Sequence, residues 1–425
     1  MSELKVLLGG KLIDGTGAEP VEDSVVVIEG KRIKAVGVKG QVEIPAKAEI
    51  MDVSGKVVMP GLIEAHTHPV RVPHVETTRY PFSLSSSPII PLFGAAQIFR
   101  NFIEFGITTV RIPHPAIPNA PELRGEWLVA LKTAVELGLI PGPRVVAAGV
   151  VLPTGGHFQC MVPPRLMPQG WWGADGVEEV RKQTRLCIYE NVDLIKVLGT
   201  TGGGGMGLDG PKKQGCTLEE MKVVVEEARF KGIPVSVHAH GGPGFDVAAE
   251  ALGKGDSMEH CTYLYEHEDA AKKMAKKGIF MVPTWSGRLL RIMDEKDPEK
   301  KLEAIKMLNE TVVKSIQKAR EYGIKIAAGT DRSPSDWSSI GVELNGYVKY
   351  GKIPPLEALV WATKNAAECL ALSDVGTIET GKIADIVVVN GDLLKNMSLL
   401  TKKENINTVI KEGCIVSRNG NLIWN

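Results

Sequence analysis

Residues 57–68 of the chain read VVMPGLIEAHTH, an apolar run that ends in two histidines separated by one residue. The run predicts a buried β-strand over 57–66. Side chains two positions apart in an extended chain point the same way, so His66 and His68 are expected to direct both imidazoles to one side, away from Thr67. Such a pair can chelate a metal ion, because imidazole is a common metal ligand. The alternative is that backbone groups satisfy both rings at the end of the strand.

Seven further short apolar runs follow, and longer segments with helical spacing lie between them. These runs predict strands over 107–112, 144–150, 193–199, 234–238, 256–260, 279–283 and 324–330. Thr217 to Glu220 forms a capping box before a helix that ends near Gly232, and a second apolar helical stripe runs from Pro354 to Leu370. This alternation favours an α/β fold, and eight units with right-handed crossovers predict a closed (β/α)8 TIM barrel.

Both ends of the chain have strand and turn patterns instead. The β-rich runs at 5–8 and 24–28 are punctuated by glycines, and similar runs return at 384–389, 408–410 and 414–416. We therefore predict that residues 1–56 and 376–425 combine into one small β-sandwich domain, and that residues 57–375 form the barrel domain.

The composition excludes several classes of protein. The chain has 425 residues, of which 44% are hydrophobic and 24% charged, as in soluble globular proteins. Fifty Lys and Arg residues balance fifty Asp and Glu residues, which leaves no basic footprint for nucleic acid or for an anionic membrane. The chain begins without a signal-peptide pattern, and its six cysteines include no Cys-x-x-Cys pair. We expect a cytoplasmic protein with reduced thiols.

The other candidate ligands fall at the carboxyl ends of predicted strands, where barrel enzymes build their sites. They are Lys196 in the fourth strand, His238 and His240 at the end of the fifth, His260 at the end of the sixth and Asp331 after the eighth. Imidazole and carboxylate ligands suit zinc or a similar divalent ion. Asp331 could instead be the N-cap of a following helix.

These residues and their positions resemble the amidohydrolase superfamily, whose signature is His-x-His on the first strand, histidines on the fifth and sixth, and Asp on the eighth. The NAAE sequence at 365–368 and the segment 376–385 look like the return of that family from the barrel to the β domain. The sequences IKV at 195–197, TGG at 201–203, VHAHG at 237–241 and MEH at 258–260 are similar to the dipeptidase and N-acyl-amino-acid hydrolase branch, which includes ochratoxin-type amidases.

The resemblance implies a binuclear metal centre, with zinc as the favoured metal. In this family Lys196 would be carboxylated by CO2, and the carbamate would bridge two ions, because an unmodified lysine would repel a dication. One ion would be held by His66, His68 and Asp331, and the other by His238 and His260. Asp331 would also act as a general base toward metal-bound water, whose pKa can fall to about 7.

Three residues are candidates for contact with substrate. His240 either contacts a substrate carbonyl or is an ordinary loop histidine. His157 lies in a Gly-Gly-His loop that the related branch also has, and Tyr263 could hydrogen-bond a substrate or simply pack. The glycines at 202–207 satisfy G-x-G-x-x-G, but the next predicted helix begins about ten residues too late for a dinucleotide site, so we predict a loop over the active site.

Other features are expected to lie outside the chemistry or to alter its specificity. His74, His114 and His267 have no recognisable partner, so we predict that they are surface or loop residues. The end of the second strand reads VRIPH at 110–114, with Ile112 after Arg111 where the branch more often shows an Arg-Asp pair.

Three functions follow as hypotheses. The first is metal-dependent hydrolysis, through a bridging hydroxide, of the C–N amide bond of a dipeptide, an N-acyl amino acid or a similar small amide. The second is deamination or hydrolysis of a cyclic amide or imidazolone ring, although such relatives usually have His-x-Glu on the fifth strand and no bridging lysine. The third is a catalytically silent barrel used for assembly, which would be expected to lose ligands. By analogy with relatives we also predict a homo-oligomer.

Overall fold

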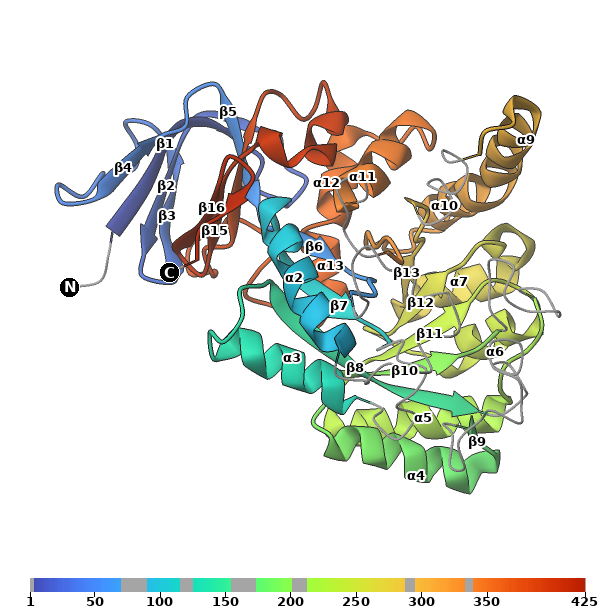
Figure 1. Cartoon of the computed structure of the whole chain (residues 1–425). Helices are drawn as coiled ribbons and strands as arrows, with labels where there is room; N and C mark the ends of the chain where they lie inside the picture. Colours follow the sequence, from blue (N-terminus) through green and yellow to red (C-terminus); the bar gives the residue numbers. More distant parts are fainter. Residues whose placement is uncertain are drawn as a thin grey trace.

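The computed structural model describes residues 4–69, 90–114, 125–153, 173–200, 212–286, 295–332 and 339–424. Figure 1 shows two bodies: a β-rich part built from both ends of the chain, and a larger part in which helices surround a curled parallel sheet. A large apolar cluster fills the space between these helices and the sheet, with Phe99, Phe102 and Met221 among its fully buried members.

The parallel sheet forms a TIM-like barrel. Its strands pair in the order β13-β12-β11-β10-β8-β7-β6, and the short strand β9 pairs with β8. Their bounds are β6 (Leu62–Glu64), β7 (Ile107–Ile112), β8 (Arg144–Pro153), β9 (Gly173–Ala174), β10 (Leu194–Leu198), β11 (Val235–Ala239), β12 (Ser257–His260) and β13 (Phe280–Val282). The order follows the chain, as the predicted right-handed units require.

Helices alternate with these strands as the sequence predicts. The longer ones are α2 (Ile90–Glu104), α3 (Glu126–Glu136), α4 (Gly176–Tyr189), α5 (Leu218–Lys231), α6 (Pro243–Ala251), α7 (Glu268–Lys277), α9 (Pro298–Leu308), α10 (Lys314–Glu321) and α11 (Ile340–Lys349). The capping box of α5 is confirmed, because Thr217 and Glu220 exchange the two expected hydrogen bonds and Gly232 ends the helix at φ 77°. The π-helical turn η3 (Asn309–Val313) joins α9 to α10.

The first predicted barrel strand is divided between the two sheets. β5 (Lys56–Pro60) pairs with β14 (Ile386–Asn390) in the other sheet, and only β6 pairs with β7. The change occurs at Gly61, where a Cβ atom would lie 2.1 Å from the Thr108 side chain, so only glycine fits the crossing. The prediction of one strand over 57–66 was therefore wrong.

The eighth predicted strand, 324–330, does not form a regular strand. It makes one isolated bridge, between Ile326 and Met281 of β13. On its other side, Ala65 N donates to Ala328 O at 3.0 Å. The segment thus lies between the two edge strands of the sheet and leads directly to Asp331.

The helix predicted from Pro354 to Leu370 is broken into α12 (Pro355–Trp361) and α13 (Lys364–Cys369). The break has a clear cause: the carbonyl of Trp361 accepts from Ala328 N, and the carbonyl of Ala362 accepts from Ile63 N, both at 2.8 Å. These carbonyls are therefore committed to the barrel and not to the continuation of the helix.

The second sheet has nine strands, in the order β17-β16-β15-β14-β5-β1-β2-β3, with β4 paired to β1. The bounds not yet given are β1 (Leu4–Leu12), β2 (Val21–Glu29), β3 (Arg32–Val38), β4 (Glu49–Asp52), β15 (Ile406–Lys411), β16 (Cys414–Arg418) and β17 (Asn421–Leu422). The sheet curls until Arg32 of β3 bridges Ile383, and it encloses an apolar cluster to which both ends of the chain contribute. Strands from both ends of the chain thus share one sheet.

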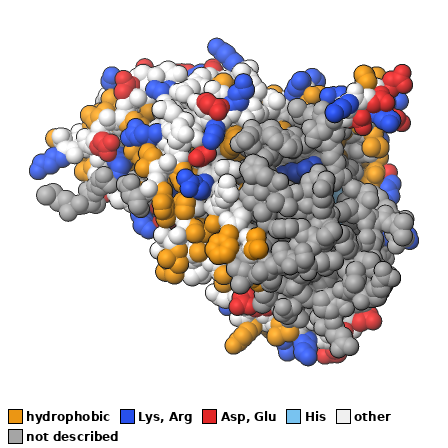
Figure 2. All heavy atoms as spheres, viewed as in Figure 1, with side chains coloured by type: hydrophobic (Ala, Val, Ile, Leu, Met, Phe, Trp, Pro, Cys, Tyr) orange, Lys and Arg blue, Asp and Glu red, His pale blue; other side chains and the backbone are white. Residues whose placement is uncertain are grey.

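Arg144 joins the two sheets. From the start of β8 it donates to Asp385 at 2.7 Å and to Glu412 at 3.1 Å, beside β14 and β15. On the face seen in Figure 2, acidic and basic side chains are intermixed over the described surface, in keeping with the zero formal net charge. Among the described residues, no helix has both the length and the apolar character needed to cross a membrane.

Candidate active site

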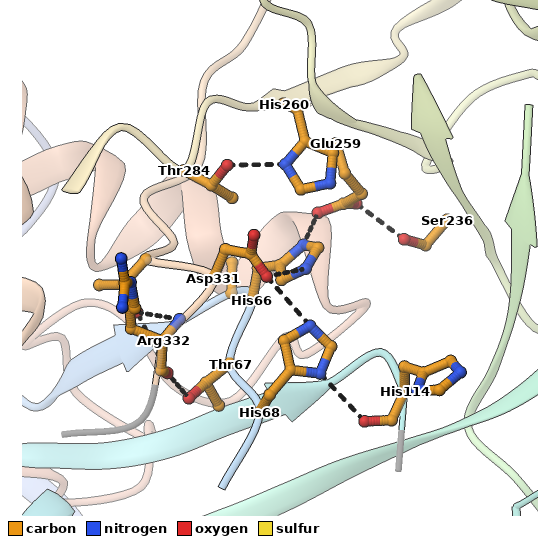
Figure 3. Close-up of polar contacts among 12 residues, drawn as sticks. His66, Thr67, His68, His114, Ser236, Glu259, His260, Thr284, Asp331 and Arg332 are labelled. Atoms are coloured by element: carbon orange, nitrogen blue, oxygen red, sulfur yellow. Dashed lines mark hydrogen bonds and ion pairs between the residues drawn. The ribbon is translucent and has the colours of Figure 1, made fainter. Parts of the chain in front are cut away.

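The first group of candidate ligands lies at the mouth of the barrel, where β6 and the segment 324–330 end. His66, His68 and Asp331 each offer a ligand atom, and these atoms lie within 4.8 Å of one another. The Asp331 carboxylate is 3.4 Å from His66 Nε2 and 3.1 Å from His68 Nε2, and Figure 3 shows both rings pointing toward it. The His-x-His pair of the sequence is therefore brought together with the remote aspartate.

The second group follows β11 and β12. His238, His240 and His260 also offer ligand atoms within 4.8 Å of one another. The His238 and His260 rings are 4.4 Å apart, and His240 stacks on His260 at 4.6 Å. The His66 ring is 5.2 Å from that of His260, so the two groups are adjacent. Burial and the neighbouring rings of His238 and His240 hold the pKa of His260 well below its ordinary range, which keeps this ring neutral and able to bind a metal ion.

Lys196 lies on β10, beside β11, and its side chain is buried. Its Nζ has no hydrogen-bond partner among the residues that the structure describes. Burial lowers the pKa of Lys196 to about 8, with Glu259 opposing the shift and Arg111 adding to it. A buried amine without a partner is costly, and it is suited to a modification that gives it one.

Four of the site histidines contact a neighbouring group through their Nδ1 nitrogen. His66 Nδ1 lies 2.6 Å from Glu259 Oε2, and His68 Nδ1 lies 3.1 Å from the backbone oxygen of His114. His240 and His260 contact the hydroxyls of Thr262 and Thr284, at 2.8 and 2.7 Å. The Nε2 atoms of His66 and His68 face Asp331, and a ring held at its other nitrogen in this way is typical of metal-binding histidines.

Asp331 is held in the left-handed backbone conformation, which is uncommon for residues other than glycine. Its φ is 56°, and its backbone N donates to His66 O at 2.8 Å. Burial opposes ionisation, but the contacts with His66 and His68 outweigh it and hold the pKa of Asp331 well below its ordinary range. The next described helix, α11, is capped by Ser339; because residues 333–338 lie outside the described residues, the alternative role of Asp331 as a helix N-cap before Arg332 stays a prediction.

Backbone conformation sets the positions of other site residues too. His260 and Thr284 have φ of 71° and 51°, which L-residues rarely adopt and which is especially unusual for a β-branched threonine. At Thr284 this conformation accompanies the contact of the hydroxyl with His260. Glu343 of α11 accepts hydrogen bonds from the next two backbone nitrogens, those of Trp285 and Ser286, and so anchors this turn.

Glu64 supports the site from inside the sheet and leads to a prediction about pH. Its Oε1 accepts from His66 N at 3.0 Å and Thr330 N at 2.9 Å, and burial raises its pKa from 4.5 to about 8. Because this pKa is higher in the folded state, the folded protein binds the proton more tightly between these values. The free energy of unfolding should therefore fall as pH rises from 4.5 to about 8, and Glu64 should contribute ~1.4 kcal/mol per pH unit to this fall.

In Glu64→Gln the amide oxygen can accept the same two bonds, but the group cannot ionise. We expect urea unfolding of the metal-free variant to lose this part of the pH dependence, so that the variant is more stable than the wild type at pH 8. Parallel stability curves for the two proteins between pH 5 and 8 would show that Glu64 is not protonated in the fold.

The other described residues singled out in the sequence lie at different distances from the two ligand groups. Tyr263 lies next to His240, because its backbone N donates to His240 O at 2.9 Å. Lys212 Nζ lies 4.2 Å from the centre of the Tyr263 ring. His114 follows β7 outside any helix or strand, as predicted, but its ring is 6.2 Å from that of His68 and so lies at the site. His267 is a loop residue that bonds Asp246 at 2.9 Å. His157, His74 and the glycines at 202–207 lie outside the described residues.

The residues that hold the ligands in place were not identified from the sequence. The most enclosed is Glu259, which has no exposed surface and bonds Arg111, Ser236 and Ser257 as well as His66. Burial favours its protonation, but Arg111 and then His66 outweigh this and hold the pKa of Glu259 well below its ordinary range. Ser257 and Glu259 share one face of a buried strand. Two polar residues at that spacing could have indicated from the sequence that this face supports a site.

Comparison with known proteins agrees with this geometry. The amidohydrolase family model matches residues 57–416. An ochratoxinase from Aspergillus niger is 30% identical over 456 aligned residues, covering 97% of this chain and 86% of that protein. An imidazolonepropionase from Rhizobium rhizogenes is 25% identical, over 88% of each protein.

Solved structures of related enzymes have a similar fold over nearly the whole chain. A Xaa-Pro dipeptidase with methionine bound in its active site has a TM-score of 0.81 and 27% identity, over 97% of this chain and 99% of that one. The structure of A. niger ochratoxinase also has a TM-score of 0.81 and 27% identity, over 100% of this chain and 99% of that one. Because the family match runs from β5 through both groups of candidate ligands to the returning strands of the second sheet, this chain belongs to the amidohydrolase family.

Proposed function

We propose that this chain is a metal-dependent hydrolase that cleaves the C–N amide bond of a dipeptide, an N-acyl amino acid or a similar small amide. The observation that carries the proposal is the pair of adjacent ligand groups, His66-His68-Asp331 and His238-His240-His260, beside a buried lysine whose Nζ has no partner among the described residues. Similarity to an ochratoxinase and to a Xaa-Pro dipeptidase supports an amide as the substrate.

The donors fit two divalent ions. His66, His68 and Asp331 would hold one ion, and His238 and His260 the other; nitrogen and carboxylate donors favour zinc. Lys196 would contribute to both after its neutral amine adds to CO2, giving an N-carboxylate and releasing one proton. Such ions, when bound, polarise a carbonyl and make hydroxide available near neutral pH.

The side chains of the chain itself have distinct tasks. Asp331 would take up the proton of the attacking water on its carboxylate and deliver it to the leaving nitrogen, which its position beside His66 and His68 allows. His240, whose Nδ1 contacts Thr262, would present Nε2 to the substrate carbonyl oxygen. We further propose that Tyr263 and His157 contact the rest of the substrate.

Hydrolysis of a cyclic amide is the second candidate, because the imidazolonepropionase is similar over most of the chain. His240 stands where the ring-acting relatives usually have glutamate, and this disfavours deamination. A catalytically silent barrel is disfavoured because the described ligand positions all carry residues able to bind a metal.

The test is a substrate screen on metal-loaded protein, with dipeptides, N-acyl amino acids and cyclic amides as the three arms. We expect elemental analysis to give about two divalent ions per chain, and chelation to abolish hydrolysis of linear amides until zinc is restored. Turnover that survives complete metal removal would contradict the proposal, and turnover confined to cyclic amides would select the second candidate. The predicted homo-oligomer is measured on the same sample by light scattering.

A further inference from the structure

The Glu259 carboxylate is surrounded by hydrogen-bond donors inside the barrel. Oε1 lies 2.8 Å from Ser236 Oγ, 2.6 Å from Ser257 Oγ and 2.7 Å from an Arg111 nitrogen. Oε2 lies 2.9 Å from the same Arg111 nitrogen and 2.6 Å from His66 Nδ1. Figure 3 shows the Glu259 side chain between Ser236 and the His66 ring.

The direction of these hydrogen bonds follows from the chemistry of the groups. Arginine can only donate, so Ser257 accepts from Arg111 at 2.8 Å and gives its own hydrogen to Glu259. A carboxylate paired with Arg111 and two serine hydroxyls can only accept. His66 Nδ1 must therefore carry a hydrogen, so the ring nitrogen that remains for a metal ion is Nε2, which faces Asp331.

We propose that Glu259, itself held by Arg111, is a positioning residue that fixes His66 in the tautomer whose Nε2 can bind a metal ion. The inference takes from the proposed function only that His66 is a ligand. Among the other rings, His68 Nδ1 faces a backbone oxygen, which no side-chain change removes. His240 and His260 face threonine hydroxyls, which can either donate or accept and so do not fix a tautomer.

The substitution Glu259→Gln is expected to reverse the tautomer of His66. The amide oxygen should face the Oε1 position, where Ser236, Ser257 and Arg111 donate, and the amide nitrogen should then face His66 Nδ1. Since that nitrogen donates, His66 Nδ1 must become an acceptor and its hydrogen must move to Nε2, the atom needed for the metal. Outer contacts of this kind typically contribute roughly 10- to 100-fold to metal affinity.

Glu64→Gln is the matched control. It makes the same change at another buried carboxylate, but Glu64 bonds the backbone nitrogen of His66 and not its ring. The control is expected to keep the wild-type tautomer of His66 and zinc affinity within about twofold of the wild type, because the amide oxygen of glutamine can accept the same backbone bonds.

The experiment is nitrogen-15 NMR of histidine-labelled, metal-free protein, with His66 assigned from the spectrum of His66→Asn, followed by zinc titration against a competing chelator. We expect hydrogen on Nδ1 of His66 in the wild type and in Glu64→Gln, hydrogen on Nε2 in Glu259→Gln, and zinc affinity roughly 10- to 100-fold weaker in Glu259→Gln alone. A purely structural role would lower stability without moving the hydrogen.

Two results would overturn the inference: wild-type His66 with its hydrogen on Nε2, or a folded Glu259→Gln whose tautomer and zinc affinity match the wild type. If Glu259→Gln does not fold, the wild-type spectrum still decides. A wild-type chain that binds no zinc would contradict the proposed function and not the tautomer, which is measured on metal-free protein.

Discussion

Replacing Asp331 by asparagine is expected to lower kcat for amide hydrolysis by about 10³-fold or more while the fold is retained. Asparagine has the same size as aspartate, and its oxygen can still face His66 and His68, whose Nε2 atoms lie 3.4 and 3.1 Å from the carboxylate. It cannot take up a proton, so the transfer from water to the leaving nitrogen is lost.

Steady-state kinetics, with elemental analysis of the variant and circular dichroism, check this result. Asp374→Asn is the control, because Asp374 is half exposed and pairs with Arg32 at 3.0 Å, away from the barrel mouth. The control should keep wild-type kcat. Full activity in Asp331→Asn would remove the proposed proton-transfer role.

The candidate ligands could be predicted from the sequence because the histidines and Asp331 lie at or just beyond the ends of short apolar runs, and Lys196 lies within one. A period of two in an extended chain places His66 and His68 on one side, and parallel strands bring their carboxyl ends to one face. Neither inference requires knowledge of which side chains touch. The fold accordingly brings His260 and Asp331, which are 71 positions apart in the chain, to the same site.

The side chains that support the ligands could not be predicted in the same way. Arg111 reaches Glu259 from β7 to β12, strands that are not neighbours in the sheet, so no local pattern relates the two residues. His114 lies beside His68 just after β7 ends, and the path of a chain beyond a strand is determined by packing rather than by periodicity.

The errors in secondary structure have the same origin. The strand predicted over 57–66 changes sheet at Gly61 because Thr108 is packed against it, and the helix predicted from Pro354 is interrupted because Trp361 and Ala362 give their carbonyls to the barrel. In each case a tertiary contact outweighs a local preference that the sequence states correctly.

Removing the Lys196 amine is expected to have opposite effects on stability and on function. In Lys196→Met a side chain of similar length replaces a buried amine whose pKa is lowered from 10.5 to about 8. A lysine whose pKa is lower in the folded state destabilises the fold below that pKa, and the cost disappears as pH rises toward the unfolded value. At pH 7 the metal-free variant should therefore be more stable than the wild type by about 3 kcal/mol.

The same variant should bind less zinc and lose hydrolysis by about 10³-fold or more, since the carboxylated amine would supply an oxygen to each ion. Lys196→Ala leaves room on β10 for a small carboxylic acid, and we expect acetate or propionate to restore part of its zinc binding and activity. Urea unfolding, zinc titration and kinetics with and without acetate measure the three effects, and native mass spectrometry of the wild type should show a labile addition of CO2. Wild-type activity in Lys196→Met would exclude a bridging role, because methionine can neither add CO2 nor offer an oxygen.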